Sequence, residues 1–148
     1  MGIYMSEADI KKFLSNLNVL VADDSEFDRE LIVAQLKAMG IRKIQLAENG
    51  SIAAGKIENA LAIRQPFQIV FTDLKMPGKD GHSLARWIRR DFQLQKMAII
   101  MTTGNSQDVE VQEFFKHGVN DIIVKPVSAE VLKKKILHLF DISEVNIA

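Results

Sequence analysis

Five short apolar runs, rich in β-branched residues, constrain the fold of this chain more than any other feature. They cover residues 19–22, 44–47, 69–72, 98–102 and 122–124. Because the runs are nearly continuous rather than alternating in polarity, they predict strands that are buried on both faces of a sheet. Longer segments with apolar residues at helical spacing separate the runs. This alternation predicts an α/β fold with a parallel sheet, right-handed crossovers and helices on both faces.

The segments between the runs carry the start and stop signals of helices. Helices are expected over residues 25–39, 49 or 51 to 62, 81–91, 106–116 and 129–140. Asp80 and Ser128 are expected N-caps, and Gly40 follows the first helix as a stop signal. No linker or low-complexity tract interrupts this pattern. We therefore expect one domain over residues 18–141, followed by a short tail over residues 142–148.

Residues 1–17 form an N-terminal extension that is expected to contribute a short additional helix. Ser6-Glu-Ala-Asp9 resembles a capping box, and apolar residues follow it at helical spacing. These residues are Ile10, Phe13, Leu14 and Leu17. Packing of this helix on its own domain is the favoured interpretation, and a homodimer or partner contact is the alternative.

The composition and charge exclude several classes of function. The 19 Lys and Arg residues balance the 19 Asp and Glu residues, so no net field recruits nucleic acid or an anionic membrane. The chain has no cysteine, which excludes disulfides and thiolate metal sites. It also has no signal-peptide-like segment and no apolar run of about 18 residues. We expect a soluble, cytoplasmic protein that recognises its partners locally, without nucleic-acid binding or membrane insertion.

Polar residues follow four of the five predicted strands. Asp23 and Asp24 follow the first strand, Asp73 the third, Thr103 the fourth and Lys125 the fifth. Ligands of open α/β sheets bind beyond the carboxyl ends of the strands, so these side chains are expected to share one rim. Taken singly, each has an ordinary explanation, such as a helix cap or a turn. Taken together, three carboxylates at one edge repel one another and call for a cation.

Mg²⁺ suits this set of side chains, because it prefers oxygen ligands and commonly bridges carboxylates to a phosphate. Formally, Mg²⁺ and Lys125 balance the charges of Asp23, Asp24 and Asp73. With these cations in place, the Asp73 carboxylate can attack phosphorus in line and form an aspartyl phosphate. Thr103 offers a hydroxyl that can bind a phosphoryl oxygen only in the modified state, which is what a switch requires.

Four motifs together resemble the receiver domains of two-component response regulators, especially the stand-alone chemotaxis type. They are VLVADDS, IVFTDLKMPGKDG, IIMTTG and DIIVKP, in this order between about Asn18 and Phe140. The resemblance implies a doubly wound, flavodoxin-like fold with strand order 2-1-3-4-5. It also implies a phosphorylation-activated switch in a two-component phosphorelay. Such a switch is not a classical enzyme, although it catalyses its own phosphotransfer and autodephosphorylation.

The resemblance assigns roles to the residues at the strand ends. Asp73 accepts the phosphoryl group from a sensor histidine kinase or a phosphotransfer protein. Asp24, Asp73 and the backbone carbonyl of Lys75 bind Mg²⁺ directly, with Mn²⁺ as a substitute, and Asp23 acts on the metal mainly through water. Lys75 and Asn105 could also influence the lifetime of the phosphate, although both are equally well explained as solvated loop residues.

The resemblance also describes how phosphorylation is transmitted to a partner. Thr103 moves toward the phosphate, Lys125 pairs with it, and the peptide bond between Lys125 and Pro126 is cis. An effector protein is expected to bind the face formed by the fourth helix, the fifth strand and the fifth helix of the domain. Ile122 occupies the position in the last strand where the family usually carries a switching Tyr or Phe. For Phe114 and Phe115, on the same face, packing in the core is favoured over exposure.

Three alternative functions compete with this interpretation. A phosphohydrolase of the haloacid dehalogenase type needs a second Asp two residues after its nucleophile, where this chain has Lys75. A flavodoxin-like cofactor binder shares the topology, but Asp23 and Asp24 would repel a flavin phosphate. A degenerate receiver that serves only as a scaffold is disfavoured, because every chemical position is present. No output domain follows residue 140, so the signal is expected to leave through a partner protein or by onward phosphotransfer.

Overall fold

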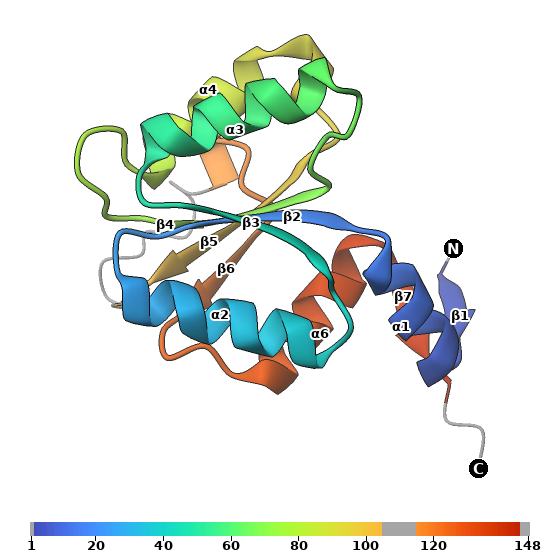
Figure 1. The fold of residues 1–148 in the computed structure, drawn as a ribbon. Helices are drawn as coiled ribbons and strands as arrows, with labels where there is room; N and C mark the ends of the chain where they lie inside the picture. Colours follow the sequence, from blue (N-terminus) through green and yellow to red (C-terminus); the bar gives the residue numbers. More distant parts are fainter. Residues whose placement is uncertain (1, 105–114, 146–148) are drawn as a thin grey trace.

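Five parallel strands form the central layer of the computed structural model, which describes residues 2–104 and 115–145 (Figure 1). The strands are β2 (Asn18–Ala22), β3 (Lys43–Ala47), β4 (Ile69–Asp73), β5 (Ala98–Thr103) and β6 (Asp121–Val124). Their order across the sheet is β3-β2-β4-β5-β6, with every neighbouring pair parallel. Counted over these five strands, this order is the predicted 2-1-3-4-5. The predicted fold class is therefore confirmed.

Helices cover both faces of this sheet, as the alternating pattern predicted. Figure 1 shows α3 (Gly50–Ala62) and α4 (Gly81–Arg90) on one face, and α2 (Glu26–Ala38) and α6 (Ala129–Leu139) on the other. A short 3-10 helix, η1 (Phe92–Leu94), follows α4. None of the helices in the described ranges combines the length and apolar character needed to span a membrane. The helix predicted over residues 106–116 falls almost entirely outside the described residues.

Each predicted N-cap in the described part of the domain accepts a backbone hydrogen bond at the start of its helix. The Asp80 carboxylate accepts from the N–H of Ser83, and the Ser128 hydroxyl accepts from the N–H of Val131. Ser25 caps α2 in the same way, by accepting from the N–H of Asp28. These caps satisfy N–H groups that the first turn of a helix leaves unpaired. The helices that begin at the carboxyl edge of the sheet therefore start at defined residues.

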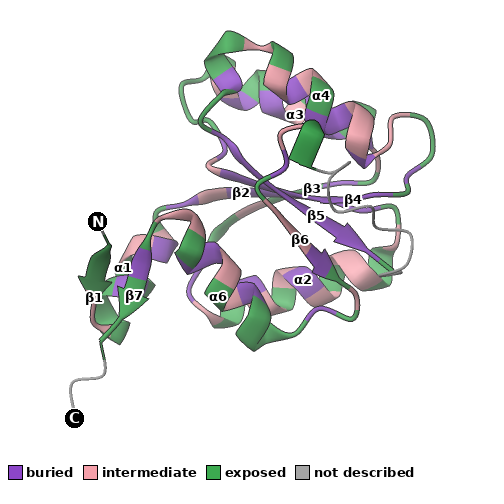
Figure 2. Ribbon diagram, turned by 180° about the vertical axis from the view of Figure 1, so that it is seen from behind, coloured by how far each residue is buried: buried purple, intermediate pink, exposed green. Residues whose placement is uncertain are grey.

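The core has two halves, one on each side of the sheet. Successive side chains of a strand point to opposite faces, so Val70 packs beneath α3 and α4 while Ile69 and Phe71 pack toward α2 and α6. All three of these side chains are almost completely buried. Figure 2 shows the same burial along the middle strands of the sheet. The prediction of strands buried on both faces is confirmed for β2, β4 and β5.

The burial prediction is wrong for β3. Only Ala47 of this strand is fully buried, and the Leu46 side chain is 38% exposed. The reason is position, because β3 is an edge strand whose single neighbour is β2. The opposite edge strand, β6, is also partly exposed, with Val124 at 43%. Apolar composition therefore identified these strands but did not show which ones lie at the edges.

The N-terminal extension is integrated into the domain core. Its predicted helix is α1 (Glu7–Ser15), and its first-turn N–H from Asp9 is accepted by the Ser6 hydroxyl at 3.1 Å. Ile10 and Leu14 of α1 are buried in the core half that contains α2 and α6. Packing on its own domain, the favoured interpretation, is thus what the structure shows. Two short strands outside the predicted elements, β1 (Ile3–Met5) and β7 (Ile142–Glu144), pair in parallel beside α1.

Candidate functional site

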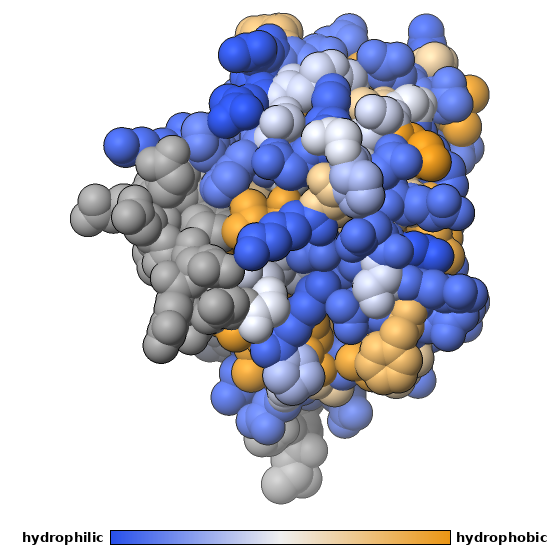
Figure 3. All heavy atoms as spheres, turned by 90° about the vertical axis from the view of Figure 1, so that its left-hand side faces the viewer, coloured by the Kyte–Doolittle hydropathy of each residue, from blue (hydrophilic) through white to orange (hydrophobic). Residues whose placement is uncertain are grey.

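Three carboxylates meet at the carboxyl edge of the sheet. Asp23 directly follows β2, Asp24 is the next residue, and Asp73 is the last residue of β4. One oxygen of each carboxylate lies within 4.8 Å of the others. Asp23 is completely buried and Asp73 is 8% exposed, whereas Asp24 is exposed. In Figure 3, which views this edge, the surface is mostly hydrophilic around small apolar patches.

Backbone contacts of the neighbouring elements hold Asp23 in place. Its N–H donates to the carbonyl of Ala47 at 3.0 Å, which extends the pairing between β2 and β3. Its Oδ1 accepts from the N–H of Ser25 at 2.9 Å, and its backbone carbonyl accepts from Arg29 Nη1 at 2.7 Å. The second carboxylate oxygen remains for the lysine described next. Asp23 is therefore held in one orientation at the start of α2.

Lys125 carries the positive charge of this cluster. Its Nζ lies 3.0 Å from Asp23 Oδ2, 2.9 Å from Asp28 Oδ2 and 3.3 Å from Asp73 Oδ2. The N–H of Lys125 donates to the carbonyl of Thr103 at 2.7 Å, so the strand pairing of β5 and β6 sets where the side chain starts. The peptide bond between Lys125 and Pro126 is cis, as the resemblance implied. Lys125 thus joins the ends of β2, β4 and β6.

Asp28 belongs to this cluster, although the sequence analysis did not identify it. The residue lies in the first turn of α2 and lines the same pocket as Asp73 and Lys125. An acidic residue in a first turn is ordinarily explained by its favourable interaction with the helix dipole. The sequence therefore held no signal that separated Asp28 from its neighbour Glu26. Only the fold shows that one of these carboxylates faces the lysine.

The balance of charge at the site is shifted toward the negative. Burial, together with the charge of Asp23, raises the pKa of the Asp73 carboxyl from 3.8 to about 6, although the charge and the hydrogen bonding of Lys125 act to lower it. Burial by itself would lower the pKa of the Lys125 ammonium, but hydrogen bonds to Asp28 and Asp23 and the charge of Asp73 raise it above its ordinary value. Lys125 is therefore protonated and still does not neutralise the carboxylates around it. Oxygen ligands with excess negative charge fit a hard divalent cation such as Mg²⁺.

An open pocket of about 380 Å³ lies beside Asp73. Asp28, Lys125 and Thr103 line it together with Asp73. Thr103 is the last residue of β5 and is 3% exposed. Of the three clustered carboxylates, only Asp73 lines this pocket, since Asp23 is buried behind it and Asp24 borders a separate one. The arrangement presents two carboxylates, of Asp28 and Asp73, to the same space as Lys125 and the hydroxyl residue Thr103.

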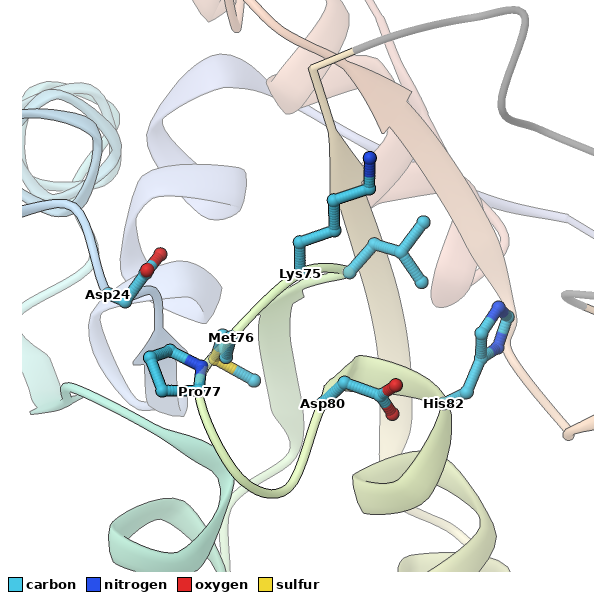
Figure 4. Close-up of a pocket in the computed structure, with 7 residues that line it drawn as sticks. Asp24, Lys75, Met76, Pro77, Asp80 and His82 are labelled. Atoms are coloured by element: carbon cyan, nitrogen blue, oxygen red, sulfur yellow. The ribbon is translucent and has the colours of Figure 1, made fainter.

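Lys75 lies in the loop after β4 and borders both pockets. Figure 4 shows the second pocket, where the Lys75 side chain extends away from the turn formed by Met76 and Pro77. Asp24 lies across this pocket from the start of α4. The backbone of Lys75 is therefore next to the carboxylates. The role of its carbonyl as a metal ligand stays a prediction.

The predicted effector face is described only in part. Ile122 is partly buried and packs on the core half that contains α3 and α4. Phe115 is 49% exposed, so the prediction that it packs in the core is wrong. Asn105 and Phe114 lie outside the described residues.

Comparisons with known proteins agree with this geometry. The family model described as response regulator receiver domain matches residues 19–137. The chain is 31% identical to the chemotaxis protein CheY-3 of Vibrio cholerae over 126 residues, which cover 85% of this chain and 93% of that protein. It is 33% identical to the chemotaxis protein CheY1 of Helicobacter pylori, with 81% of this chain and 94% of that protein covered.

Solved structures show the same similarity in three dimensions. The chemotaxis protein CheY4 of Vibrio cholerae superposes with a TM-score of 0.74 at 26% identity, covering 83% of this chain and 98% of that one. A two-component system response regulator/GGDEF domain protein superposes with a TM-score of 0.80 at 27% identity. That match covers 90% of this chain but 52% of the other, so this chain spans about half its length.

The phosphohydrolase and flavin-binding alternatives are therefore set aside. The chain belongs to the response regulator receiver domain family and is a phosphorylation-activated response regulator of two-component signalling.

Proposed function

We propose that Asp73 is the residue that accepts the phosphoryl group, from a phosphohistidine of a sensor histidine kinase or a phosphotransfer protein. One observation carries this assignment. Among the clustered carboxylates Asp23, Asp24 and Asp73, only Asp73 opens into the pocket that Lys125 and Thr103 also line. The attacking oxygen must be reachable by a bulky phosphoryl donor. Asp23 and Asp24 do not line the pocket that holds the lysine and the hydroxyl.

The reaction balances without any further reactant. A carboxylate oxygen of Asp73 attacks phosphorus in line, the bond from phosphorus to the imidazole nitrogen breaks, and its electron pair stays on that nitrogen. Lys125, 3.3 Å from Asp73 Oδ2, neutralises charge on the transferred oxygens. Thr103 donates its hydroxyl to one of them. Attack of water on phosphorus later releases inorganic phosphate and restores the carboxylate, which is the autodephosphorylation step.

We further propose that Asp23, Asp24, Asp73 and the Lys75 carbonyl hold Mg²⁺, with Mn²⁺ as a substitute. When bound, the cation supplies positive charge for the phosphoryl oxygens. The exposure of Asp24 and the opening of Asp73 into the pocket support direct contact of both with the cation, while the buried Asp23 is held by Ser25 and Lys125. This difference supports the indirect role of Asp23. The excess negative charge of the cluster supports the need for the cation.

The phosphorylated state is proposed to change the affinity for a partner protein at the surface of β6 and α6. Thr103 and Val124 are register partners across β5 and β6, and Ile122 lies opposite Met101. A shift of Thr103 toward the phosphoryl group therefore acts on the strand that carries Ile122. Because Ile122 is β-branched and smaller than the usual aromatic residue, we expect a smaller rearrangement of this side chain.

Mass spectrometry of the intact protein tests the proposal. Incubation with acetyl phosphate and Mg²⁺ should add one phosphoryl group to the wild type and none to Asp73→Asn. Asp80→Asn is the matched control, because Asp80 lies in the same loop and Asn can still cap α4. A chelator should abolish the modification. If the wild type stays unmodified while its fold is intact, the chain is a degenerate receiver used as a scaffold, and the proposal fails.

A further inference from the structure

Asp28 places a fourth carboxylate at the phosphorylation pocket. Its Oδ2 lies 2.9 Å from Lys125 Nζ, which is the shortest of the three contacts that this ammonium makes with carboxylates. The side chain is 33% exposed and lines the pocket together with Asp73 and Thr103. The carboxylate is thus positioned where an incoming phosphoryl group would meet Lys125.

Three carboxylates surround the Lys125 ammonium before phosphorylation. The ammonium donates hydrogen bonds to Asp23 and Asp28, and Asp73 lies within ion-pair distance at 3.3 Å. A phosphoryl group on Asp73 that binds Lys125 therefore has to share the ammonium with Asp23 and Asp28. Asp23 is buried and held on its other oxygen by Ser25. Asp28 is the partly exposed acceptor, so it is the one that can turn toward water.

The charge count changes when Asp28 is included. Asp23, Asp24, Asp28 and Asp73 carry four negative charges, and Lys125 with a bound Mg²⁺ carries three positive charges. With Lys75, which also lines the pocket, the groups are formally balanced before phosphorylation. Replacing a carboxylate by an aspartyl phosphate adds roughly one further negative charge near neutral pH. The added charge is repelled by Asp28, which binds the same lysine.

We propose that Asp28 is a positioning residue that competes with the phosphoryl group for Lys125 and so opposes the phosphorylated state. The carboxylate holds the lysine in the resting chain, and a phosphoryl group on Asp73 has to draw the ammonium away from this contact. Asp28 acts through Lys125 and through its charge, without a covalent step of its own. This inference rests on the proposed function of Asp73. It predicts a receiver whose phosphorylated form is less stable than it would be with a neutral residue at this position.

The chain contains a matched pair of variants for the test. Asp28 is the third residue of α2, and its N–H donates to the capping Ser25 hydroxyl. Asp9 is the third residue of α1, and its N–H donates to the capping Ser6 hydroxyl. Asp28→Asn and Asp9→Asn each remove one first-turn charge while leaving the backbone cap in place. The two variants differ in that only Asp28 contacts Lys125.

Beryllofluoride, a non-hydrolysable phosphoryl analogue, measures the effect at equilibrium. Isothermal titration in the presence of Mg²⁺ should show that Asp28→Asn binds it about fivefold more tightly than the wild type, or about 1 kcal/mol. Asp9→Asn should match the wild type. The gain should shrink as salt is added, because Asp28 is partly exposed and its repulsion is screened. A role in folding alone would not produce a tighter, salt-dependent affinity.

The outcomes separate this inference from the proposed function. If the wild type binds beryllofluoride and Asp28→Asn binds it equally or more weakly, the inference is overturned while the proposed function stands. If neither protein binds it, the proposed function fails and the inference fails with it. Asp28→Ser, which also removes the charge, replaces Asp28→Asn if circular dichroism shows that the latter is not folded.

Discussion

Lys125 Nζ lies 3.3 Å from Asp73 Oδ2, although the two residues come from strands that are not neighbours in the sheet. Asp73 ends β4, Lys125 follows β6, and β5 lies between these strands. The contact exists because parallel strands in register end at one edge, where Asp73 is opposite Thr102 and Thr103 is opposite Val124. The ion pair therefore depends on the register of β4, β5 and β6.

Asp73→Asn should stabilise the protein at neutral pH in the absence of divalent cations. The raised pKa of about 6 means that the folded chain binds this proton more tightly than the unfolded chain, whose value is near 3.8. Stability from this group is therefore present at about pH 4 and is lost as the pH rises through 6. A shift of this size corresponds to about 3 kcal/mol at most, so we expect a gain of about 1–3 kcal/mol.

Urea unfolding at about pH 7 and about pH 4 checks this prediction. The difference between Asp73→Asn and the wild type should be largest at the higher pH and should nearly vanish at the lower one. Asp80→Asn, a carboxylate in the same loop, should show no such dependence. A variant that is less stable than the wild type at both pH values would contradict the expectation that the ionised Asp73 carboxylate destabilises the fold.

Mg²⁺ should raise the melting temperature of the wild type through binding to the folded state. Asp24→Asn should weaken the apparent affinity about tenfold, because an exposed carboxylate that contacts the cation is lost. Glu26→Gln, an exposed first-turn neighbour in α2, is the control and should behave like the wild type. Differential scanning fluorimetry over a range of MgCl₂ concentrations measures both. If the melting temperatures of Asp24→Asn and the wild type rise equally with MgCl₂ concentration, Asp24 does not bind the cation.

Lys125→Ala should destabilise the protein by about 2–4 kcal/mol, because it leaves the buried Asp23 carboxylate without its counter-charge. Lys135→Ala is the comparison, since Lys135 pairs with Asp121 at 2.8 Å while both side chains are partly exposed. That pair should contribute at most about 1 kcal/mol. Equilibrium unfolding in urea distinguishes the two. Similar losses in both variants would mean that the strand-end cluster is no more sensitive than a surface ion pair.

Gly81→Ala should distort the backbone at Asp73. A Cβ at Gly81 would lie 2.5 Å from the Asp73 carbonyl oxygen and 2.5 Å from Met101 Sδ, so the loop after β4 would have to move. We expect a loss of about 1–3 kcal/mol and slower phosphorylation by acetyl phosphate. Gly55→Ala, inside α3 with nothing within 4 Å, should instead stabilise by about 0.5–1 kcal/mol. Unchanged phosphorylation kinetics in Gly81→Ala would show that this close approach does not position Asp73.

Local signals in the sequence were sufficient for the elements that they concern. Ser25, Asp80 and Ser128 precede helical patterns, and each caps its helix as such residues do. Strand positions followed from apolar runs, because residues buried on both faces of a sheet leave no polar alternation. Neither the caps nor the apolar runs show which elements lie next to one another in the folded chain. The exposure of Phe115, and of Leu46 on an edge strand, was consequently missed.

The pairing of β1 with β7 was also beyond the sequence. These strands have three residues each and come from distant parts of the chain. They contact each other, and β1 also contacts α1 while β7 contacts α6. Segments this short carry too little periodicity to be separated from loops. The N-terminal helix was predictable, because its cap and apolar spacing are local. The pairing of β1 with β7 was not predictable.

The sequence by itself determined the strand and helix order and the acidic, hydroxyl and lysine residues at the strand ends. These features are local, since each depends on residue type and on spacing within a few turns or one strand. Only the tertiary structure decided that Asp28 shares Lys125 with Asp73, and that Asp73 rather than Asp23 or Asp24 lines the pocket beside it. Contacts between residues far apart in the chain depend on strand register and on side-chain direction. For that reason the charge of the pocket, which governs its chemistry, could be counted correctly only after the chain was folded.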